Sequence, residues 1–195
     1  MLTGFDEAVV VDVETTGLDP VADRIVSAAL IRTNFGGLRE NTDRLDGMTW
    51  GAVINPQSPI PSQATRIHGI TDRDVAGNST FQDIAQEMRD IIGDLPVIAH
   101  NVSFDRNFLD AEFRRAGVKT LHRNKSHCTM RRFQEFNHGI RKGSNLDNVV
   151  RVMGLERRKG SVHDAIEDAR LAMQVAGLFY LMDNRIAPAV GTGWS

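Results

Sequence analysis

The stretch from residue 8 to residue 14 constrains the fold more than any other part of the chain. The run Ala8–Val13 is almost wholly apolar and rich in valine, and it breaks at Thr15–Gly17, which predicts a buried central strand ending in a turn. Asp12 and Glu14 stand two residues apart, so their side chains leave the same face of this strand. Two neighbouring carboxylates in a half-buried place are unfavourable unless a proton, a basic side chain or a metal ion separates them. Clustered acids suit Mg²⁺ or Mn²⁺, although a solvated strand end would also fit the pattern.

The hydrophobic pattern further along the chain predicts strands first and helices later. Arg24–Thr33 and Thr49–Ile54 are expected to form an antiparallel meander with the first strand. A short strand is expected at 97–99, and helices are expected near 81–92, 104–113, 130–136, 146–153 and from 165 onward. Expected helix N-caps are Ser79 or Thr80, Ser103 and Ser161. This order predicts an α/β layer architecture with a mixed sheet.

Length and composition indicate one ordinary globular domain. The chain has 195 residues, of which 41% are hydrophobic and 25% charged, which excludes disordered, collagen-like and coiled-coil proteins. We expect a single domain over residues 1–185 and a loose tail over 186–195. The lone cysteine, Cys128, cannot form an internal disulfide, and the N-terminus lacks the features of a signal peptide. No apolar run approaches the roughly 18 residues of a membrane span. We therefore expect a cytoplasmic protein that does not bind membranes.

Charge is distributed unevenly along the chain. Residues 1–113 contain 8 Lys/Arg against 18 Asp/Glu, whereas residues 114–159 contain 13 Lys/Arg against 3 Asp/Glu. An acidic part that could hold cations, beside a basic part that could hold a polyanion, suits a metal-dependent enzyme acting on nucleic acid. Solvated helix faces would give the same counts.

Two later acids also lie within apolar elements. Asp105 falls in the first turn of the helix after the short strand, where an acid also complements the helix dipole. Asp168 lies early in the last helix, five residues after His163, and a solvent-facing acid is the alternative interpretation. At about 100° per residue the two would be about 140° apart on a regular helix. His163 can therefore share a site with Asp168 only if it lies at or before the start of that helix.

Together these segments resemble the three motifs of the DEDDh (DnaQ-like) family of 3′–5′ exonucleases, to which the epsilon proofreading subunit of bacterial DNA polymerase III belongs. The motifs are Val9–Leu18, His100–Asp105 and His163–Ala169, and Ile67–Thr71 resembles a segment that follows the third strand in epsilon-like members. Any one motif would be weak evidence, but four occur in the expected order. The resemblance implies a ribonuclease H-like exonuclease fold, with a five-stranded mixed sheet flanked by helices.

The resemblance also implies the roles of individual residues. Two divalent cations, Mg²⁺ or Mn²⁺, would be the cofactors of phosphodiester hydrolysis. Their ligands would be Asp12, Glu14, Asp105 and Asp168, with Asp12 bridging the ions. His163 would be the general base, a role that imidazole chemistry allows near neutral pH. The expected substrate-binding residues are Thr15, Thr16, Gly17, Leu18, His68, Ile70, His100, Asn101 and Phe104.

Some of these substrate assignments compete with structural roles. Leu18 and Ile70 are candidate wedges against the terminal bases, and Phe104 is a candidate stacking surface. Phe108 is a weaker stacking candidate because most aromatic residues at helical spacing belong to the core. His68 and His100 suit loop structure as well as they suit a nucleotide pocket.

The main prediction is a metal-dependent enzyme that removes nucleoside 5′-monophosphates from the 3′ end of single-stranded or frayed DNA, in proofreading or repair. One alternative is an exoribonuclease that trims RNA 3′ ends, since nothing in the motifs senses the 2′-hydroxyl. Another is a binding module associated with a polymerase. DNA is favoured over RNA as the partner, with a DNA polymerase or clamp as a second candidate partner. The chain ends 13 residues after Met182, which we expect to weaken polymerase tethering.

Overall fold

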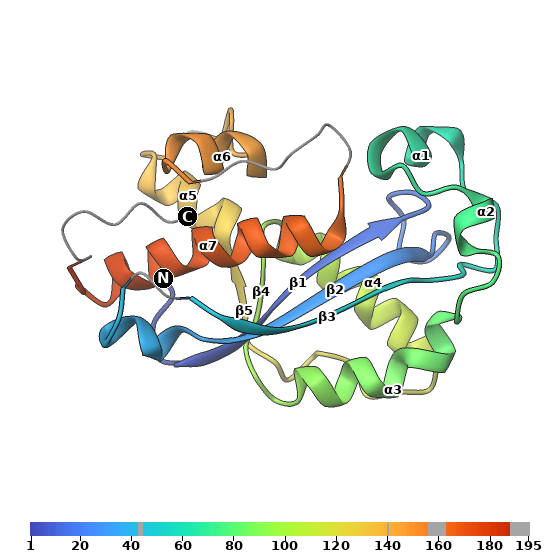
Figure 1. The fold of residues 1–195 in the computed structure, drawn as a ribbon, viewed down its shortest axis with the longest axis horizontal. Helices are drawn as coiled ribbons and strands as arrows, with labels where there is room; N and C mark the ends of the chain where they lie inside the picture. The colour runs from blue at the N-terminus through green and yellow to red at the C-terminus, as the bar shows by residue number, and fades with distance from the viewer. Residues whose placement is uncertain (43–44, 140, 156–162, 188–195) are drawn as a thin grey trace.

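The computed structural model describes residues 1–42, 45–139, 141–155 and 163–187, which form a five-stranded sheet covered on both faces by helices (Figure 1). The strands are β1 (Glu7–Thr15), β2 (Ile25–Asn34), β3 (Gly47–Val53), β4 (Val97–Ala99) and β5 (Ser126–Cys128). The helices are the 3-10 helix η1 (Phe35–Arg39), α1 (Ser62–His68), α2 (Asp72–Val75), α3 (Phe81–Ile92), α4 (Val102–Arg115), α5 (Thr129–Phe136), α6 (Leu146–Val152) and α7 (Ala165–Asp183).

β1 is the central strand of a mixed sheet with the order β3-β2-β1-β4-β5. β2 pairs antiparallel with β1 and with β3, whereas β4 runs parallel to β1, and β5 runs parallel to β4. The valine-rich run is thus hydrogen-bonded at both edges, and it is apolar on both faces because each face packs into a hydrophobic core. The predicted α/β architecture with a mixed sheet is confirmed.

The side chains of β1 divide between two hydrophobic cores. Ala8 and Val10 pack into the core that α7 covers, while Val9, Val11 and Val13 pack into the core beneath α3 and α4. Successive side chains of a strand point to opposite faces, so the even-numbered acids of β1 lie on the α7 side of the sheet. Figure 1 shows that the first turn of α7 lies near the end of β1. The strand and the helix thereby converge at one place.

The longest helix, α7, spans 19 residues and packs across β1 and β2. None of the helices in the described ranges is both long and apolar enough to cross a membrane.

Besides the 3-10 helix η1, three elements of the structure were not predicted from the residue pattern, and each is short. β5 has only three residues, Ser-His-Cys, and α2 has only four, so neither shows a readable period. α1 directly follows Pro56, Pro59 and Pro61, which interrupt any regular hydrophobic period before it. Pro61 occupies the N-cap of α1, where its missing N–H has no hydrogen bond to lose.

The N-caps of the helices can be compared with those expected from the sequence. Thr80 caps α3 through a reciprocal pair of hydrogen bonds with Asp83, as the sequence predicts. The N-cap of α4 is Asn101 rather than Ser103, because the helix begins two residues earlier than the apolar pattern suggests. The N-cap of α7 is Asp164 rather than the expected Ser161, because the helix begins only at Ala165. Ser161 itself and residues 188–195 of the expected tail lie outside the described residues.

Asp183, the last residue of α7, joins this helix to the N-terminal segment and to α5. Its carboxylate accepts the backbone N–H of Leu2 at 2.7 Å and two N–H groups of Arg132 at 2.7 and 3.1 Å. Its side chain is only 3% exposed. Burial by itself would raise the pKa of Asp183, but the hydrogen bonds and charge of Arg132 outweigh burial and lower it.

Replacing Asp183 with Asn should lower the free energy of unfolding by about 2–4 kcal/mol, because the Arg132 guanidinium loses its charged partner. The lowered pKa makes this contribution full above the unfolded value, so the difference from wild type should shrink as the pH falls below about 4. Urea denaturation at several pH values measures both effects. Asp94→Asn is the matched control, since the Asp94 side chain is 86% exposed and its ion pairs should contribute little. Equal losses for the two variants would contradict this account of Asp183.

Candidate active site

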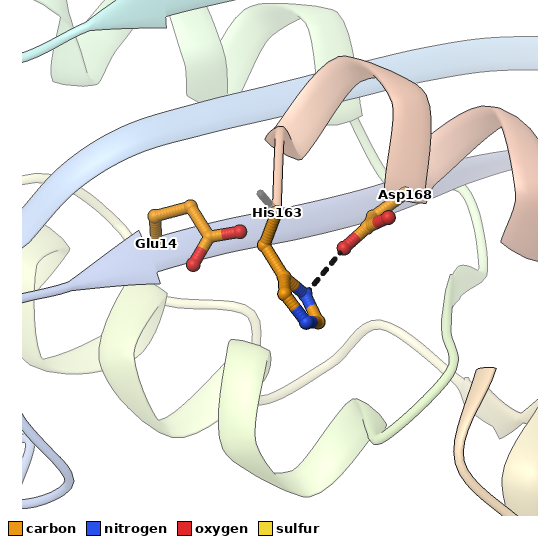
Figure 2. A group of neighbouring side chains, drawn as sticks. All are labelled: Glu14, His163 and Asp168. Atoms are coloured by element: carbon orange, nitrogen blue, oxygen red, sulfur yellow. Dashed lines mark hydrogen bonds and ion pairs between the residues drawn. The ribbon is translucent and has the colours of Figure 1, made fainter. Parts of the chain in front are cut away.

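Three side chains from distant parts of the sequence meet at the end of β1. Glu14, His163 and Asp168 each offer a ligand atom, and these atoms all lie within 4.8 Å of one another (Figure 2). The Nδ1 atom of His163 is hydrogen-bonded to Oδ2 of Asp168 at 2.9 Å. Both carboxylates are buried, with exposures of 9% for Glu14 and 3% for Asp168. The group has the donors and the spacing of a small cation site.

His163 reaches this group because it precedes α7. The helix begins at Ala165, and Asp164 is its N-cap and accepts the backbone N–H of Glu167. The backbone N–H of His163 donates to the carbonyl of Ile67 at 3.0 Å, which fixes the residue against the end of α1. The predicted position of His163, before the start of the helix, is confirmed.

Asp105 is buried in the first turn of α4, with 4% of its surface exposed. β4 ends at Ala99, so β1 extends past its neighbour, and the Val13 N–H donates to Oδ1 of Asp105 at 3.2 Å. Burial, together with the nearby charge of Asp168 and against the opposing effect of backbone hydrogen bonds, raises the pKa of Asp105 to about 7. A second negative charge at this place is therefore unfavourable without a counter-ion.

Asp12 lies on the same strand face as Glu14, two residues earlier, and is half-buried. It is not among the three residues whose ligand atoms fall within 4.8 Å of one another. The pairing of β1 with β2 shifts register between Glu14 and Thr15. Such an irregularity can change the direction of a side chain at the end of a strand. The structure thus places all four predicted acids at or near the end of β1.

A cleft of about 420 Å³ opens beside these acids. It is lined from the β1 side by Glu14, Thr15, Thr16, Gly17 and Leu18, from the α1 side by Pro61, Gln63, Ala64, Ile67 and His68, and from α4 by Phe104. Six of the predicted substrate-binding residues belong to this lining. The α1 wall was foreseen only at His68, because the helix itself was not predicted. Ile67, which is 54% exposed, belongs to the motif Ile67–Thr71, but the sequence did not predict that it lines the cleft.

The two histidines that the sequence could not separate have different surroundings. His68 lines the cleft, is 4% exposed, and accepts the Ile70 N–H on Nδ1 at 3.1 Å. Burial lowers the pKa of His68, only partly offset by the carbonyl of Thr15. His100 instead uses both ring nitrogens in hydrogen bonds, to the Thr129 hydroxyl at 2.9 Å and to the Ser144 carbonyl at 2.7 Å.

His100 therefore joins the end of β4 to α5 and to the loop before α6. Burial lowers the pKa of His100, which favours the neutral ring in this place. Since the cleft lining does not include it, its contact with substrate stays a prediction.

Three other predicted or weighed residues also lie away from the cleft lining. Ile70 packs against Val26 and Ile60 in a small separate core, and Asn101 is exposed at the start of α4. Phe108 is fully buried, 4.9 Å from the Phe104 ring, so the weaker stacking candidate is a core residue.

The basic residues that the structure describes between 114 and 155 lie in more than one place. Arg123 and Lys125 line a cleft with residues 4–7, at the beginning of β1. Glu14 lies at the other end of this nine-residue strand, about 25 Å away by strand geometry. Arg141 and Lys142 instead belong to an exposed loop whose Ser144 carbonyl is bonded to His100, just after β4. Only part of the basic segment therefore lies at the site end of the sheet.

The fold and the cluster of acids are those of a nuclease family. A family model described as Exonuclease, of the RNase T type, matches residues 9–176, and the chain belongs to this exonuclease family. The family predicted from the motifs is confirmed.

Among its relatives, the epsilon subunit of DNA polymerase III from Haemophilus influenzae is 30% identical over 176 residues, which cover 89% of this chain. This chain spans 66% of that subunit's length, about two thirds.

Solved structures show the same fold at lower sequence identity. Escherichia coli exonuclease I, in its zinc-bound complex with single-stranded DNA, matches with a TM-score of 0.74 and 20% identity over 93% of this chain and 42% of that chain. A 3′-exonuclease that recognises the histone mRNA stem-loop matches with a TM-score of 0.74 and 15% identity over 93% of this chain and 84% of that chain. The ribonuclease H-like exonuclease fold is therefore confirmed.

Without divalent metal, the melting temperature should fall as the pH rises from about 4 to about 7, because folded Asp105 retains a proton that the unfolded chain has already lost. Asp105→Asn removes this proton equilibrium while keeping an acceptor for the Val13 N–H, so the fall should become shallower. Thermal melts in chelator across this pH range measure the slope. The same slope in both proteins would contradict the raised pKa.

Proposed function

We propose that this chain is a metal-dependent 3′–5′ exonuclease that hydrolyses the terminal phosphodiester bond of single-stranded or frayed DNA and releases nucleoside 5′-monophosphates. The observation that carries the proposal is the convergence of Glu14, His163 and Asp168 within 4.8 Å, beside buried Asp105 and a cleft that shares Glu14. Membership in the exonuclease family supports the same activity.

The donor set fits divalent cations. Asp12, Glu14, Asp105 and Asp168 offer only carboxylate oxygens, which Mg²⁺ and Mn²⁺ prefer. Burial and the charge of Asp168 raise the pKa of Asp105, and a bound cation would offset both effects and favour the ionised carboxylate. When bound, a pair of cations neutralises phosphoryl oxygens and activates a water molecule. We propose these four acids as the ligands.

His163 is proposed as the general base. With Asp168 accepting a hydrogen bond from Nδ1, the other ring nitrogen, Nε2, is the one that can take a proton from water. The side chain is 43% exposed, so solvent can reach it. The Ile67 carbonyl fixes its backbone, which limits how far the ring can move from the acids.

The cleft beside the acids is proposed to hold the terminal nucleotide. Leu18 and Phe104 offer apolar surface to a base, and the backbone near Gly17 can approach the sugar closely. Because Glu14 belongs both to the cleft and to the acid cluster, a nucleotide in the cleft would present its 5′-phosphate to the acids. Such contacts do not read sequence.

DNA is the proposed substrate because the relatives include a DNA polymerase III subunit and a structural neighbour was solved with single-stranded DNA. A DNA polymerase or clamp as a partner rests on the same similarity to epsilon. Arg141 and Lys142 are proposed to contact phosphates upstream of the 3′ end, since the Ser144 carbonyl of their loop is bonded to His100, the residue that follows β4.

With Mg²⁺, a 3′-labelled single strand should release labelled mononucleotide at once, whereas a 5′-labelled strand should shorten progressively. Chelator should abolish both signals, and Asp12→Ala should lower the rate at least about a hundredfold while the fold persists. Gel analysis of matched DNA and RNA strands gives the direction and the sugar preference together. Label released first from the 5′ end, or hydrolysis that survives chelation, would refute the proposal.

His163→Gln should lower kcat by about 10²- to 10⁴-fold, because the general base is lost, and should leave KM within about twofold. Steady-state kinetics on a short single strand give both constants. His122→Gln, at an exposed position in the loop between α4 and β5, should behave as wild type. A variant in which only KM changes would assign His163 to substrate binding instead.

A further inference from the structure

The turn between β1 and β2 is closed by its own hydrogen bonds. The backbone N–H of Thr16 donates to the carbonyl of Arg24 at 2.9 Å, and the Arg24 N–H donates to the Thr16 hydroxyl at 3.0 Å. Asp23 accepts the N–H of Asp19 at 2.9 Å and packs so closely on Gly17 that a Cβ there would overlap its carboxylate. Leu18 projects from this turn with 83% of its surface exposed, at the edge of the cleft.

A buried carboxylate on α4 holds the end of this turn. Glu112 is 1% exposed, and its two oxygens accept Nε–H and Nη2–H of Arg24 at 2.7 and 3.2 Å. The Ile25 N–H also approaches Oε1 of Glu112, at 3.4 Å. Such a two-pronged pair fixes both position and orientation. Glu112 follows Asp105 by two helical turns, so the same face of α4 carries both acids.

Arg115 extends this contact to the outer part of the turn. Its Nη1 lies 3.3 Å from Oε1 of Glu112, and its Nη2 donates to the carbonyls of Pro20 and Val21 at 2.6 and 2.7 Å. One guanidinium thus bridges a buried acid and two backbone carbonyls, which a single amine could do only in part. Its charge is directed at the turn and at Glu112, rather than at an incoming phosphate.

We propose that Arg115 is a positioning residue that, together with Glu112, fixes turn 16–24 against α4 and so holds Leu18 at the cleft as a wedge between the last two bases of a 3′ end. This inference rests on the proposed exonuclease function. Because α4 also carries Phe104 and Asp105, the helix sets the turn, the stacking surface and one acid relative to each other. The contribution of Arg115 is to substrate grip, not to the chemical step.

The test compares Arg115→Ala with Arg114→Ala. Arg114 is the neighbouring residue on α4 and is exposed, and its side chain makes no hydrogen bond or ion pair with the described residues, so its variant loses the same charge without loosening the turn. Each variant is assayed on a single-stranded oligonucleotide and on p-nitrophenyl thymidine 5′-phosphate, a small ester with no penultimate base. Hydrogen exchange of the peptide covering residues 16–24 reports on the turn directly, and melting temperatures check the fold.

Arg115→Ala should raise KM for the oligonucleotide about tenfold with kcat within about twofold, and should change hydrolysis of the small ester less than about twofold. Exchange in residues 16–24 should be faster than in wild type, Arg115→Lys should recover part of the affinity, and Arg114→Ala should match wild type.

Several results would overturn the inference. An equal defect in Arg114→Ala would mean that Arg115 only contributes charge. An equal loss on both substrates would mean that it acts on the acid cluster. Unchanged exchange in residues 16–24 would mean that it does not hold the turn, and this readout needs no activity. If the wild type hydrolyses neither substrate, the proposed function fails, whereas the exchange comparison still decides the role of Arg115.

Discussion

The repulsion between acids at the end of β1 is the constraint around which the site is built. β1 is the central strand, and its valines anchor it in two cores, so Glu14 cannot move away from Asp168 without disrupting that packing. Asp105 adds a third buried carboxylate, held in place by the Val13 N–H. An arrangement that costs free energy in the isolated chain is compatible with a stable fold because burial of β1 and α7 offsets it. The same arrangement concentrates negative charge at the site, which a bound cation would neutralise.

Elements with a clear hydrophobic period could be predicted from the sequence. α3 and β4 begin and end where the pattern places them, and the acids of the site were found because they interrupt apolar elements. β5 and α2 could not be found because three or four residues give no period. Glu112 was also missed as a functional candidate. Its partner Arg24 lies 88 residues away in sequence, so only the folded chain shows why an acid is buried there.

The histidines show a different limit of sequence reasoning. His68 is the last residue of α1 and His100 follows β4, and both lie in family-like motifs, so the sequence alone does not separate their roles. The structure separates them by hydrogen bonding, because both nitrogens of His100 are used between α5 and the loop before α6, whereas His68 lines the cleft. Information of this kind comes from residues far along the chain. A histidine in a motif is therefore a weaker indication of substrate contact than an acid in a core.

The bond between the Ile67 carbonyl and the His163 N–H has a consequence for how the enzyme could diversify. It joins the α1 wall to His163, the proposed general base, through main-chain atoms alone, so it does not depend on which side chains α1 carries. Residues such as Gln63 and Ile67 can therefore be exchanged, in evolution or by engineering, while the reacting groups keep their places. Under the proposed function, the preference for a base or sugar at the 3′ end of the substrate can therefore change while the residues that hydrolyse the phosphodiester bond stay in place.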